Sequence, residues 1–332
     1  MSPRKTLFLH IGSHKTATTF LQNSLAANPA LLEGMGLCYP QTGRIWDAHF
    51  KLCWELKDPA LHDRPLERLP LWSQLLAEVA ASPHPVAVLS SEEFGLGLDA
   101  TRLEALKAHH DVQVVFYLRS PDSYMESFYN QFVKDFGTRE TRSIETHVAE
   151  EGLFFLDTMR ILRPWVDMFG PRAVRLRLFD RAHLPDGILA DFLRTLGFSA
   201  WPDFPPPARS VLHKASLPPD ALEYLRLSNP WLDRQEGHHD FVVDLVAMAQ
   251  KNAEALQQTR AGLLSLKARQ TLRRRFRDTN FEAAKLLLGA ARTPFPPPDA
   301  PPPPADFDRR LPEADAAVMG KVAAMIRNSS RG

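Results

Sequence analysis

The segment KTLFLHIGSHKTATT, residues 5–19, decides the fold of this chain. Residues 6–11 form a near-continuous apolar run closed by Gly12, which is typical of a parallel strand buried on both faces. A polar loop, residues 13–17, follows, and after it come hydroxyl residues and apolar residues at helical spacing. The segment therefore predicts a strand, a loop and a helix that meet at the carboxyl end of the strand.

The same alternation continues along the chain and predicts an α/β protein. Apolar runs predict further buried strands at residues 86–89, 112–118 and 174–179. Helical spacing predicts helices between and after them, at residues 71–81, 100–109, 122–134, 158–169 and 187–196. Strands that alternate with helices indicate βαβ units, and hence a parallel β-sheet flanked by helices.

After residue 200 the pattern changes to helices and proline. Helices are predicted at residues 219–227, 241–266, 271–288 and 311–326, with a Pro-rich extended segment over 294–304. We therefore expect an α/β core over residues 1–230. A helical C-terminal extension over 231–332 is expected to pack on the same domain.

Composition excludes several classes of protein. The 332 residues are 44% hydrophobic and 24% charged, and the net charge is +1, as in ordinary globular proteins. Total charge implies no nucleic-acid partner, so any basic site must be local. No apolar run reaches the ~18 residues of a membrane span. The apolar stretch near the N-terminus is too short for a secretory signal. The two cysteines do not have the spacing of metal ligands. These features predict a cytoplasmic protein and leave its oligomeric state open.

The loop after the first strand is a candidate anion site. Backbone N–H groups at a helix N-terminus can hold an anion, and Lys15 adds a positive charge beside them. The alternative is ordinary capping by Thr18 or Thr19 with a solvated Lys15. A Walker A nucleotide loop is a poor match, because His14 stands where that motif has its second glycine.

A second candidate anion site follows the strand predicted at residues 112–118. Arg119 comes directly after this strand, where ligands of open α/β sheets bind. Ser127 follows about two helical turns further on and can fall on the same side as Arg119. A surface ion pair is the alternative role for Arg119.

Together these two motifs resemble those of the sulfotransferases that use 3′-phosphoadenosine 5′-phosphosulfate (PAPS). The resemblance covers roughly residues 5–230 and implies a P-loop-like fold with PAPS as sulfuryl donor and no metal. It implies that the 5′-phosphosulfate binds to the loop residues Lys15, Thr16, Ala17, Thr18 and Thr19. It implies that Arg119 and Ser127 hold the 3′-phosphate, and it makes Lys214 and Ser216 weaker candidates for a later cofactor loop.

Ala17 departs from the family pattern, which has glycine at this position. If the position required a positive φ angle, alanine would be strained by about 1 kcal/mol or more. If the loop is an ordinary helix entry, alanine costs nothing. We expect the ordinary helix entry.

Sulfuryl transfer needs a base for the acceptor hydroxyl. Glu92, which follows the strand predicted at residues 86–89, is the first candidate and Glu93 the next. Such a glutamate is expected to need a raised pKa, through burial or a neighbouring carboxylate. His49 is the competing candidate, because an imidazole needs less adjustment of its pKa.

The resemblance predicts transfer of the sulfuryl group from PAPS to a hydroxyl or amine acceptor by in-line displacement, with Lys15 stabilising the leaving oxygen. The acceptor can be a small molecule, a carbohydrate or a lipid. The alternatives are a P-loop-like kinase that uses ATP and Mg²⁺ and a non-catalytic anion-binding protein of the same fold. The basic run over residues 267–277 could bind a sulfated acceptor, but we expect a solvated helix face there.

Overall fold

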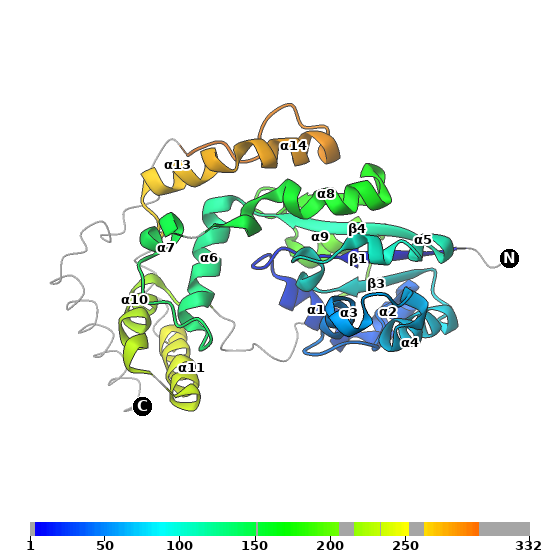
Figure 1. Ribbon diagram of the computed structural model, residues 1–332, viewed down its shortest axis with the longest axis horizontal. Helices are drawn as coiled ribbons and strands as arrows, with labels where there is room; N and C mark the ends of the chain where they lie inside the picture. The colour runs from blue at the N-terminus through cyan, green and yellow to red at the C-terminus, as the bar shows by residue number, and fades with distance from the viewer. Residues whose placement is uncertain (1–3, 151, 206–215, 233, 252–261, 299–332) are drawn as a thin grey trace. The chain divides into compact units, whose positions relative to one another are not determined.

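The computed structural model describes residues 4–150, 152–205, 216–232, 234–251 and 262–298 (Figure 1). Its contacts define two compact units that alternate along the chain. The first unit lies within residues 1–120, 154–207 and 276–295, and the second within residues 121–153, 208–275 and 296–332. The core boundary expected at residue 230 stays a prediction. The predicted helix over 311–326 and most of the Pro-rich segment lie outside the described residues.

The first unit contains a five-stranded sheet of order β2-β3-β1-β4-β5, in which all pairs are parallel. Its strands are β1 (Lys5–His10), β2 (Leu37–Cys38), β3 (Val86–Ser90), β4 (His110–Leu118) and β5 (Val174–Leu178). Figure 1 shows β1, β3 and β4 running side by side. The α/β class with a parallel sheet is therefore confirmed.

Helices cover both faces of this sheet, because successive side chains of each strand point to opposite faces. Leu7 and Leu9 of β1 belong to one hydrophobic cluster, whereas Phe8 belongs to the other. The first cluster includes residues of α3 (Phe50–Lys57), α4 (Pro70–Ala81), α5 (Leu106–His109), α8 (Thr158–Phe169) and α14 (Arg277–Leu288). The second includes residues of α1 (Thr18–Ala27), α2 (Pro29–Met35) and α9 (Gly187–Thr195). Burial on both faces explains the near-continuous apolar character of the strands.

The connections make the carboxyl ends of β1 and β3 a topological switch point. The chain leaving β1 enters α1 on one face of the sheet, whereas the chain leaving β3 places Phe94 and Leu103 in the cluster on the other face. Neighbouring strands whose connections depart to opposite faces open a crevice at their carboxyl ends, and ligands of α/β proteins bind there. The loop of residues 11–17 and Glu92 both lie at this position.

Two predicted helices are interrupted in the first unit. The helical pattern after the loop covers Phe20 to Leu31, but α1 ends at Ala27 and α2 begins at Pro29, whose ring nitrogen has no N–H to donate. The helix predicted over 100–109 is a 3₁₀ turn, Ala100–Leu103, followed by α5. Helical spacing alone does not reveal either break.

The second unit is helical. It contains α6 (Pro121–Lys134), α7 (Ile144–Glu150), α10 (Pro219–Ser228), α11 (Gln235–Lys251) and α13 (Leu266–Arg275). The basic run was expected to be a solvated helix face, but Arg269 and Arg273 of α13 form ion pairs with the fully buried Asp122 of α6. Arg269 also pairs with Glu126. These two arginines therefore join α13 to α6, because buried carboxylates require such partners.

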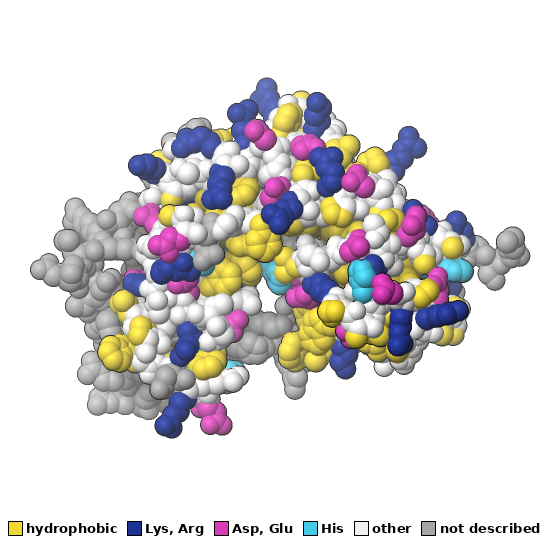
Figure 2. Space-filling model, viewed as in Figure 1, with side chains coloured by type: hydrophobic (Ala, Val, Ile, Leu, Met, Phe, Trp, Pro, Cys, Tyr) yellow, Lys and Arg dark blue, Asp and Glu magenta, His cyan; other side chains and the backbone are white. Residues whose placement is uncertain are grey.

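The surface charges and the helices of the described residues agree with the near-zero net charge and the lack of long apolar runs in the sequence. Figure 2 shows lysine and arginine side chains interspersed with aspartate and glutamate over the visible face. Among the helices that the structure describes, none has the length and apolar character needed to cross a bilayer.

Candidate functional site

Gly12 lets the loop after β1 pass close to Glu92. Its φ angle is +43°, and a Cβ atom there would lie 3.1 Å from Cγ2 of Thr18 and 3.2 Å from Cγ of Glu92. Both distances are tighter than ordinary van der Waals contact, so a side chain at this position would push the loop away from Glu92. The absence of a side chain at Gly12 therefore allows the candidate anion loop to lie close to the candidate base.

The φ angle of the loop backbone alternates in sign. Lys15 has φ 64° and Ala17 has φ 59°, whereas Thr16 and Thr18 have negative φ angles. Such alternation turns successive N–H groups into one concavity, the geometry of an anion-binding nest. The first turn of α1 follows directly, and its N–H groups have no partners within the helix. The loop therefore stays a candidate anion site that would act through its backbone N–H groups.

The expectation for Ala17 was wrong. It precedes the first residue of α1 in the left-handed region and makes no side-chain cap. An L-residue in this region loses about 1–2 kcal/mol through crowding of its Cβ atom. The neighbouring backbone imposes this conformation, and an alanine carries no sequence signal that would reveal it.

We expect Ala17→Gly to stabilise the protein by about 0.5–1 kcal/mol. The gain is the relief of left-handed strain, reduced by the greater freedom of glycine in the unfolded chain. Chemical unfolding monitored by circular dichroism measures it. Ala26→Gly, within the right-handed helix α1, is the matched control and should cost about 0.5–1 kcal/mol. A loss of stability in Ala17→Gly would contradict the left-handed assignment.

The threonine hydroxyls near the loop are partly committed within the protein. Thr16 donates to the carbonyl of Ser13 over 2.7 Å, which closes the turn, and Thr18 donates to Oε1 of Glu92. Thr19, in the first turn of α1, is half-buried. Thr16 and Thr18 therefore fix the loop with their side chains, and their contribution to anion binding would come through the backbone.

Glu92 begins a 3₁₀ turn, Glu92–Gly95, that Ser91 caps by accepting a hydrogen bond from the N–H of Glu93. The Glu92 side chain is 6% exposed and accepts hydrogen bonds from Thr18 and, over 3.1 Å, from Nε2 of Gln22. Burial acts to raise the pKa of this carboxyl, but the electrostatic interaction with His14 and these hydrogen bonds outweigh it and lower the pKa. The expected rise in pKa is absent, and Glu92 is an ionised carboxylate at neutral pH.

Glu93, the second candidate base, has a different partner. Its Oε2 lies 2.7 Å from Nζ of Lys57, and both side chains are partly exposed. Lys57 ends α3, so this ion pair connects α3 to the turn that carries Glu92. Glu93 is therefore partly exposed and paired with Lys57, whereas Glu92 is buried.

His49, the competing candidate base, is fully buried with both ring nitrogens engaged. The N–H of Ser90 donates to Nδ1 over 3.1 Å, and Nε2 lies 3.0 Å from the carbonyl of Pro40. Since Nδ1 accepts, Nε2 must carry the proton and donate. Burial lowers the pKa of His49 to about 4. In this geometry the ring connects the segment before α3 to the end of β3.

This burial of His49 predicts a loss of stability in acid. The folded-state pKa is about 4 and the ordinary value is 6.5, so the unfolded chain binds the proton more readily. The stability that depends on the neutral His49 ring is fully present above pH 6.5. It decreases as the pH falls below 6.5, and the loss is complete once the pH has fallen through about 4. For one such group the total is about 3 kcal/mol.

Urea unfolding of wild type and His49→Asn between pH 4 and 7 tests this prediction. The variant should show a shallower loss of stability in acid, whereas the exposed His62→Asn should follow the wild type. Parallel curves for wild type and His49→Asn would show that His49 does not titrate as described.

Arg119 connects the two predicted anion motifs. It follows β4, and its Nη1 donates to the carbonyl of Lys15 over 2.6 Å. The guanidinium also lies over the ring of Phe179, 5.6 Å from its centroid, which restricts the side chain further. The loop after β1 and the residue after β4 are therefore in direct contact within the first unit.

The remaining predicted residues lie in the second unit or outside the described residues. Ser127 is half-buried in α6, and Ser216 is exposed before α10. Lys214 lies outside the described residues. Within the first unit, the structure brings together the loop, Glu92 and Arg119.

Sequence reasoning missed a buried polar network behind Glu92. Gln22 donates to Oγ of Ser90 as well as to Glu92, and Nδ1 of His10 lies 2.8 Å from the same Oγ. Burial lowers the pKa of His10 to about 4, so its ring is neutral. Gln22 follows Thr18 by one helical turn, so the two side chains lie on the same face of α1. This spacing was the sequence signal that could have indicated a shared partner. Among the described residues, no group of His, Cys, Asp or Glu side chains could hold a metal ion.

Comparison with known proteins assigns no family to the chain. No protein-family model matches the sequence. Over 114 residues the chain is 30% identical to an uncharacterized protein of Archaeoglobus fulgidus, and this match covers 33% of the chain but only 30% of the relative's length. A solved sulfotransferase from Alicyclobacillus acidocaldarius aligns over 71% of this chain and 99% of its own, with 19% identity and a TM-score of 0.38. An alignment of this quality carries no functional argument.

Proposed function

We propose that the protein transfers the sulfuryl group of PAPS to a hydroxyl or amine acceptor. The observation that carries the proposal is the hydrogen bond from Arg119 to the carbonyl of Lys15. It brings together two candidate anion-binding features from separate strands of one sheet, and this supports a nucleotide with phosphates on both its 5′ and 3′ oxygens. The sequence resemblance to PAPS-dependent sulfotransferases supports the same ligand.

The loop after β1 would bind the 5′-phosphosulfate. Its alternating backbone, the first turn of α1 and the positive charge of Lys15 all favour an oxyanion at this place. Arg119 would bind the 3′-phosphate, because the fork of a guanidinium can hold a carbonyl on one side and an oxyanion on the other. Ser127, Lys214 and Ser216 stay candidates for the same nucleotide.

The reaction would be an in-line displacement at sulfur. The acceptor oxygen or nitrogen forms a bond to sulfur while the bond from sulfur to the bridging oxygen breaks, and adenosine 3′,5′-bisphosphate leaves with that electron pair. The carboxylate of Glu92 accepts the proton of the acceptor. Lys15 stabilises the charge that develops on the leaving oxygen. Positioning by the loop supplies much of the remaining acceleration.

The lowered pKa of Glu92 has two opposite consequences for its role as the base. Its lowered pKa keeps it ionised at neutral pH, in the form that accepts a proton. The same lowering makes it a weak base in the free protein. Thr18 and Gln22 hold both of its oxygens, so binding of the donor to the loop that carries Thr18 would act directly on its basicity.

A thermal-shift comparison separates this function from the kinase, and a turnover assay separates it from a non-catalytic protein. Adenosine 3′,5′-bisphosphate with a chelator is expected to stabilise the wild type, and ATP with Mg²⁺ is not. At about 100 times its Kd, a ligand adds about 2.7 kcal/mol and raises the melting temperature by several degrees. Stabilisation by ATP and Mg²⁺ alone would favour the kinase. Binding without any turnover of PAPS over a panel of acceptors would favour the non-catalytic protein.

A further inference from the structure

Three aromatic side chains lie at the surface of the first unit, on α3 and on the turn before it. Trp46 is 70% exposed and Trp54 is 46% exposed. Phe50 is partly exposed, and its ring centroid lies 6.4 Å from that of Trp46 and 6.2 Å from that of Trp54. The rings of Phe50 and Trp54 are within 12° of parallel. We call these three side chains the aromatic platform, because exposed apolar side chains that cluster in this way indicate a binding surface.

Trp46 lies in a turn that disfavours a bulky side chain. The N–H of Ile45 donates to the carbonyl of Ala48 over 2.8 Å, and the N–H of Ala48 donates back to the carbonyl of Ile45 over 3.1 Å. The two residues between them, Trp46 and Asp47, have φ angles of 50° and 67°. Such a turn favours asparagine or glycine, and a bulky residue at a positive φ angle is an outlier. Strained residues of this kind concentrate at ligand sites, so the turn supports a binding role for Trp46.

Hydrogen bonds place this turn beside the elements that carry the candidate donor site. The side-chain amide of Asn23 in α1, in the orientation that satisfies its partners, donates to Oδ2 of Asp47 over 3.2 Å. The N–H of His49 donates over 2.8 Å to the carbonyl of Ser90, which ends β3 two residues before Glu92. The turn therefore lies next to both α1 and the carboxyl end of β3.

The other end of the platform lies near the residues that follow β3. Phe50, Trp54 and Lys57 succeed one another at helical spacing, so they share one face of α3. Nζ of Lys57 lies 2.7 Å from Oε2 of Glu93, and α3 packs against the turn that begins at Glu92. The platform therefore follows α3 toward the candidate base.

His14 relates the same end of α3 to the loop after β1. Burial lowers the pKa of His14, and Glu92 and Glu93 oppose this shift. Lys15 and Lys57 lower the pKa further. His14 therefore lies within electrostatic range of the lysine of the candidate donor loop and of the lysine that ends α3.

We propose that the aromatic platform binds the acceptor of sulfuryl transfer and that this acceptor is an uncharged carbohydrate. The inference rests on the proposed function. The C–H bonds on one face of a sugar ring can pack on an aromatic ring, while the hydroxyl groups stay free for polar partners. The carboxylate of Asp47 can accept from such hydroxyls at one end of the platform. The ion pair of Lys57 and Glu93 offers a donor and an acceptor at the other end, next to the turn that carries Glu92.

Other classes of acceptor fit this surface less well. Pockets for small molecules enclose most of the surface of their ligand, whereas Trp46 and Trp54 are open to solvent. A polyanion would meet the carboxylates of Asp47 and Glu93, and an ammonium group would meet Lys57. A chain of uncharged sugar rings matches both the open aromatic surface and the mixed charges beside it.

Saturation-transfer NMR with the full-length protein measures carbohydrate binding without any turnover. The probes are β-1,4-linked tetrasaccharides of glucose, mannose, galactose and N-acetylglucosamine, each measured separately, and 2-naphthol as a flat aromatic alcohol. At least one tetrasaccharide is expected to bind, with saturation transferred mainly to the C–H protons of its rings. Absence of binding by every tetrasaccharide, or tighter binding of 2-naphthol than of each of them, would overturn the proposal.

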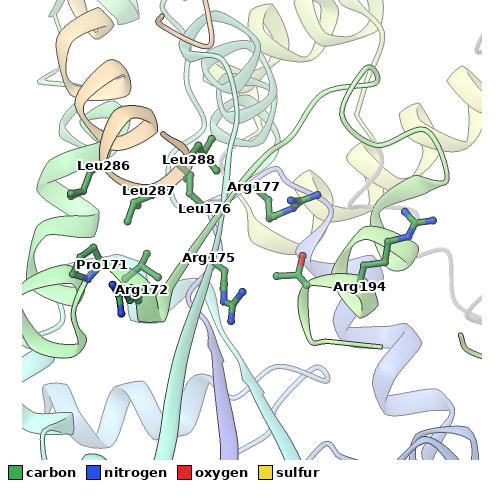
Figure 3. A pocket seen from close by; sticks show the side chains of 11 residues that line it. Pro171, Arg172, Arg175, Leu176, Arg177, Arg194, Leu286, Leu287 and Leu288 are labelled. Atoms are coloured by element: carbon green, nitrogen blue, oxygen red, sulfur yellow. The ribbon is translucent and has the colours of Figure 1, made fainter. Parts of the chain in front are cut away.

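Two tryptophan variants test the place of binding. Asparagine suits a positive φ angle, so Trp46→Asn should be at least as stable to urea as the wild type, yet bind the tetrasaccharide about tenfold more weakly. Trp54→Ala should weaken binding by a similar factor. The matched control is Leu288→Ala, a side chain of the same unit that is 43% exposed and lines a cavity beside β5 (Figure 3). Unchanged binding in either tryptophan variant, or an equal loss in the control, would overturn the proposal.

The outcomes also separate this inference from the proposed function. Carbohydrate binding that depends on both tryptophans, without turnover of PAPS on any acceptor, would remove the proposed function and leave the binding surface. Turnover of an acceptor whose KM is unchanged in Trp46→Asn would keep the proposed function and remove the assignment of the platform to the acceptor.

Discussion

Lys15→Ala is expected to reduce sulfuryl transfer by about 10²–10³-fold while the protein stays folded. Loss of one group that stabilises developing charge in an active site has an effect of this size. The fold should survive because Arg119 binds the backbone carbonyl of Lys15, which alanine retains. Release of adenosine bisphosphate from PAPS at saturating donor measures the effect.

The matched control for this prediction is Lys51→Ala. Lys51 is exposed on α3 and lies outside the loop, so its removal should leave turnover within about twofold of wild type. Urea unfolding of both variants checks that they are equally folded. Full turnover in Lys15→Ala would show that this lysine does not stabilise the leaving group.

Glu92→Gln is expected to reduce turnover by about 10²–10⁴-fold, the usual range for loss of a general base. His49→Asn is expected to retain most of the turnover, because both nitrogens of His49 already bind backbone groups. The asparagine oxygen can still accept from the N–H of Ser90. It loses the bond to Pro40, so His49→Asn should cost about 1–3 kcal/mol of stability.

A structural effect of Glu92→Gln has to be separated from a chemical one. The new amide can place its NH₂ group against Nε2 of Gln22, which is also a donor. Unchanged binding of adenosine bisphosphate would show that the loop is intact, and the loss would then lie in proton transfer. If His49→Asn abolished turnover in a folded protein while Glu92→Gln kept it, the roles of the two residues would have to be exchanged.

Much of the first unit could be predicted because its signals are local. Strands buried on both faces produce apolar runs, and β1, β3, β4 and β5 lie within a few residues of the predicted ranges. Helix α8 lies where its pattern predicted it, at Thr158–Phe169. The loop between β1 and α1 was found in the same way, from the change of an apolar run into polar and hydroxyl residues.

Features that depend on contacts between distant residues could not be predicted. His49 is defined by its bonds to Pro40 and Ser90, and no local pattern indicates such partners. The lowered pKa of Glu92 likewise depends on His14, and then on Thr18 and Gln22 of α1. The ion pairs between Asp122 and the arginines of α13 join segments far apart in sequence, so the basic run suggested solvation instead.

Calorimetric titration with adenosine 3′,5′-bisphosphate and adenosine 5′-monophosphate tests most directly whether the loop after β1 and Arg119 bind one nucleotide. We predict that the wild type binds the bisphosphate at least tenfold more tightly, and that Arg119→Ala abolishes this preference. Lys15→Ala should lower the affinity for both nucleotides by similar factors. Equal affinities of the wild type for the two nucleotides, or an unchanged preference in Arg119→Ala, would contradict the assignment of Arg119 to the 3′-phosphate and the function built on it.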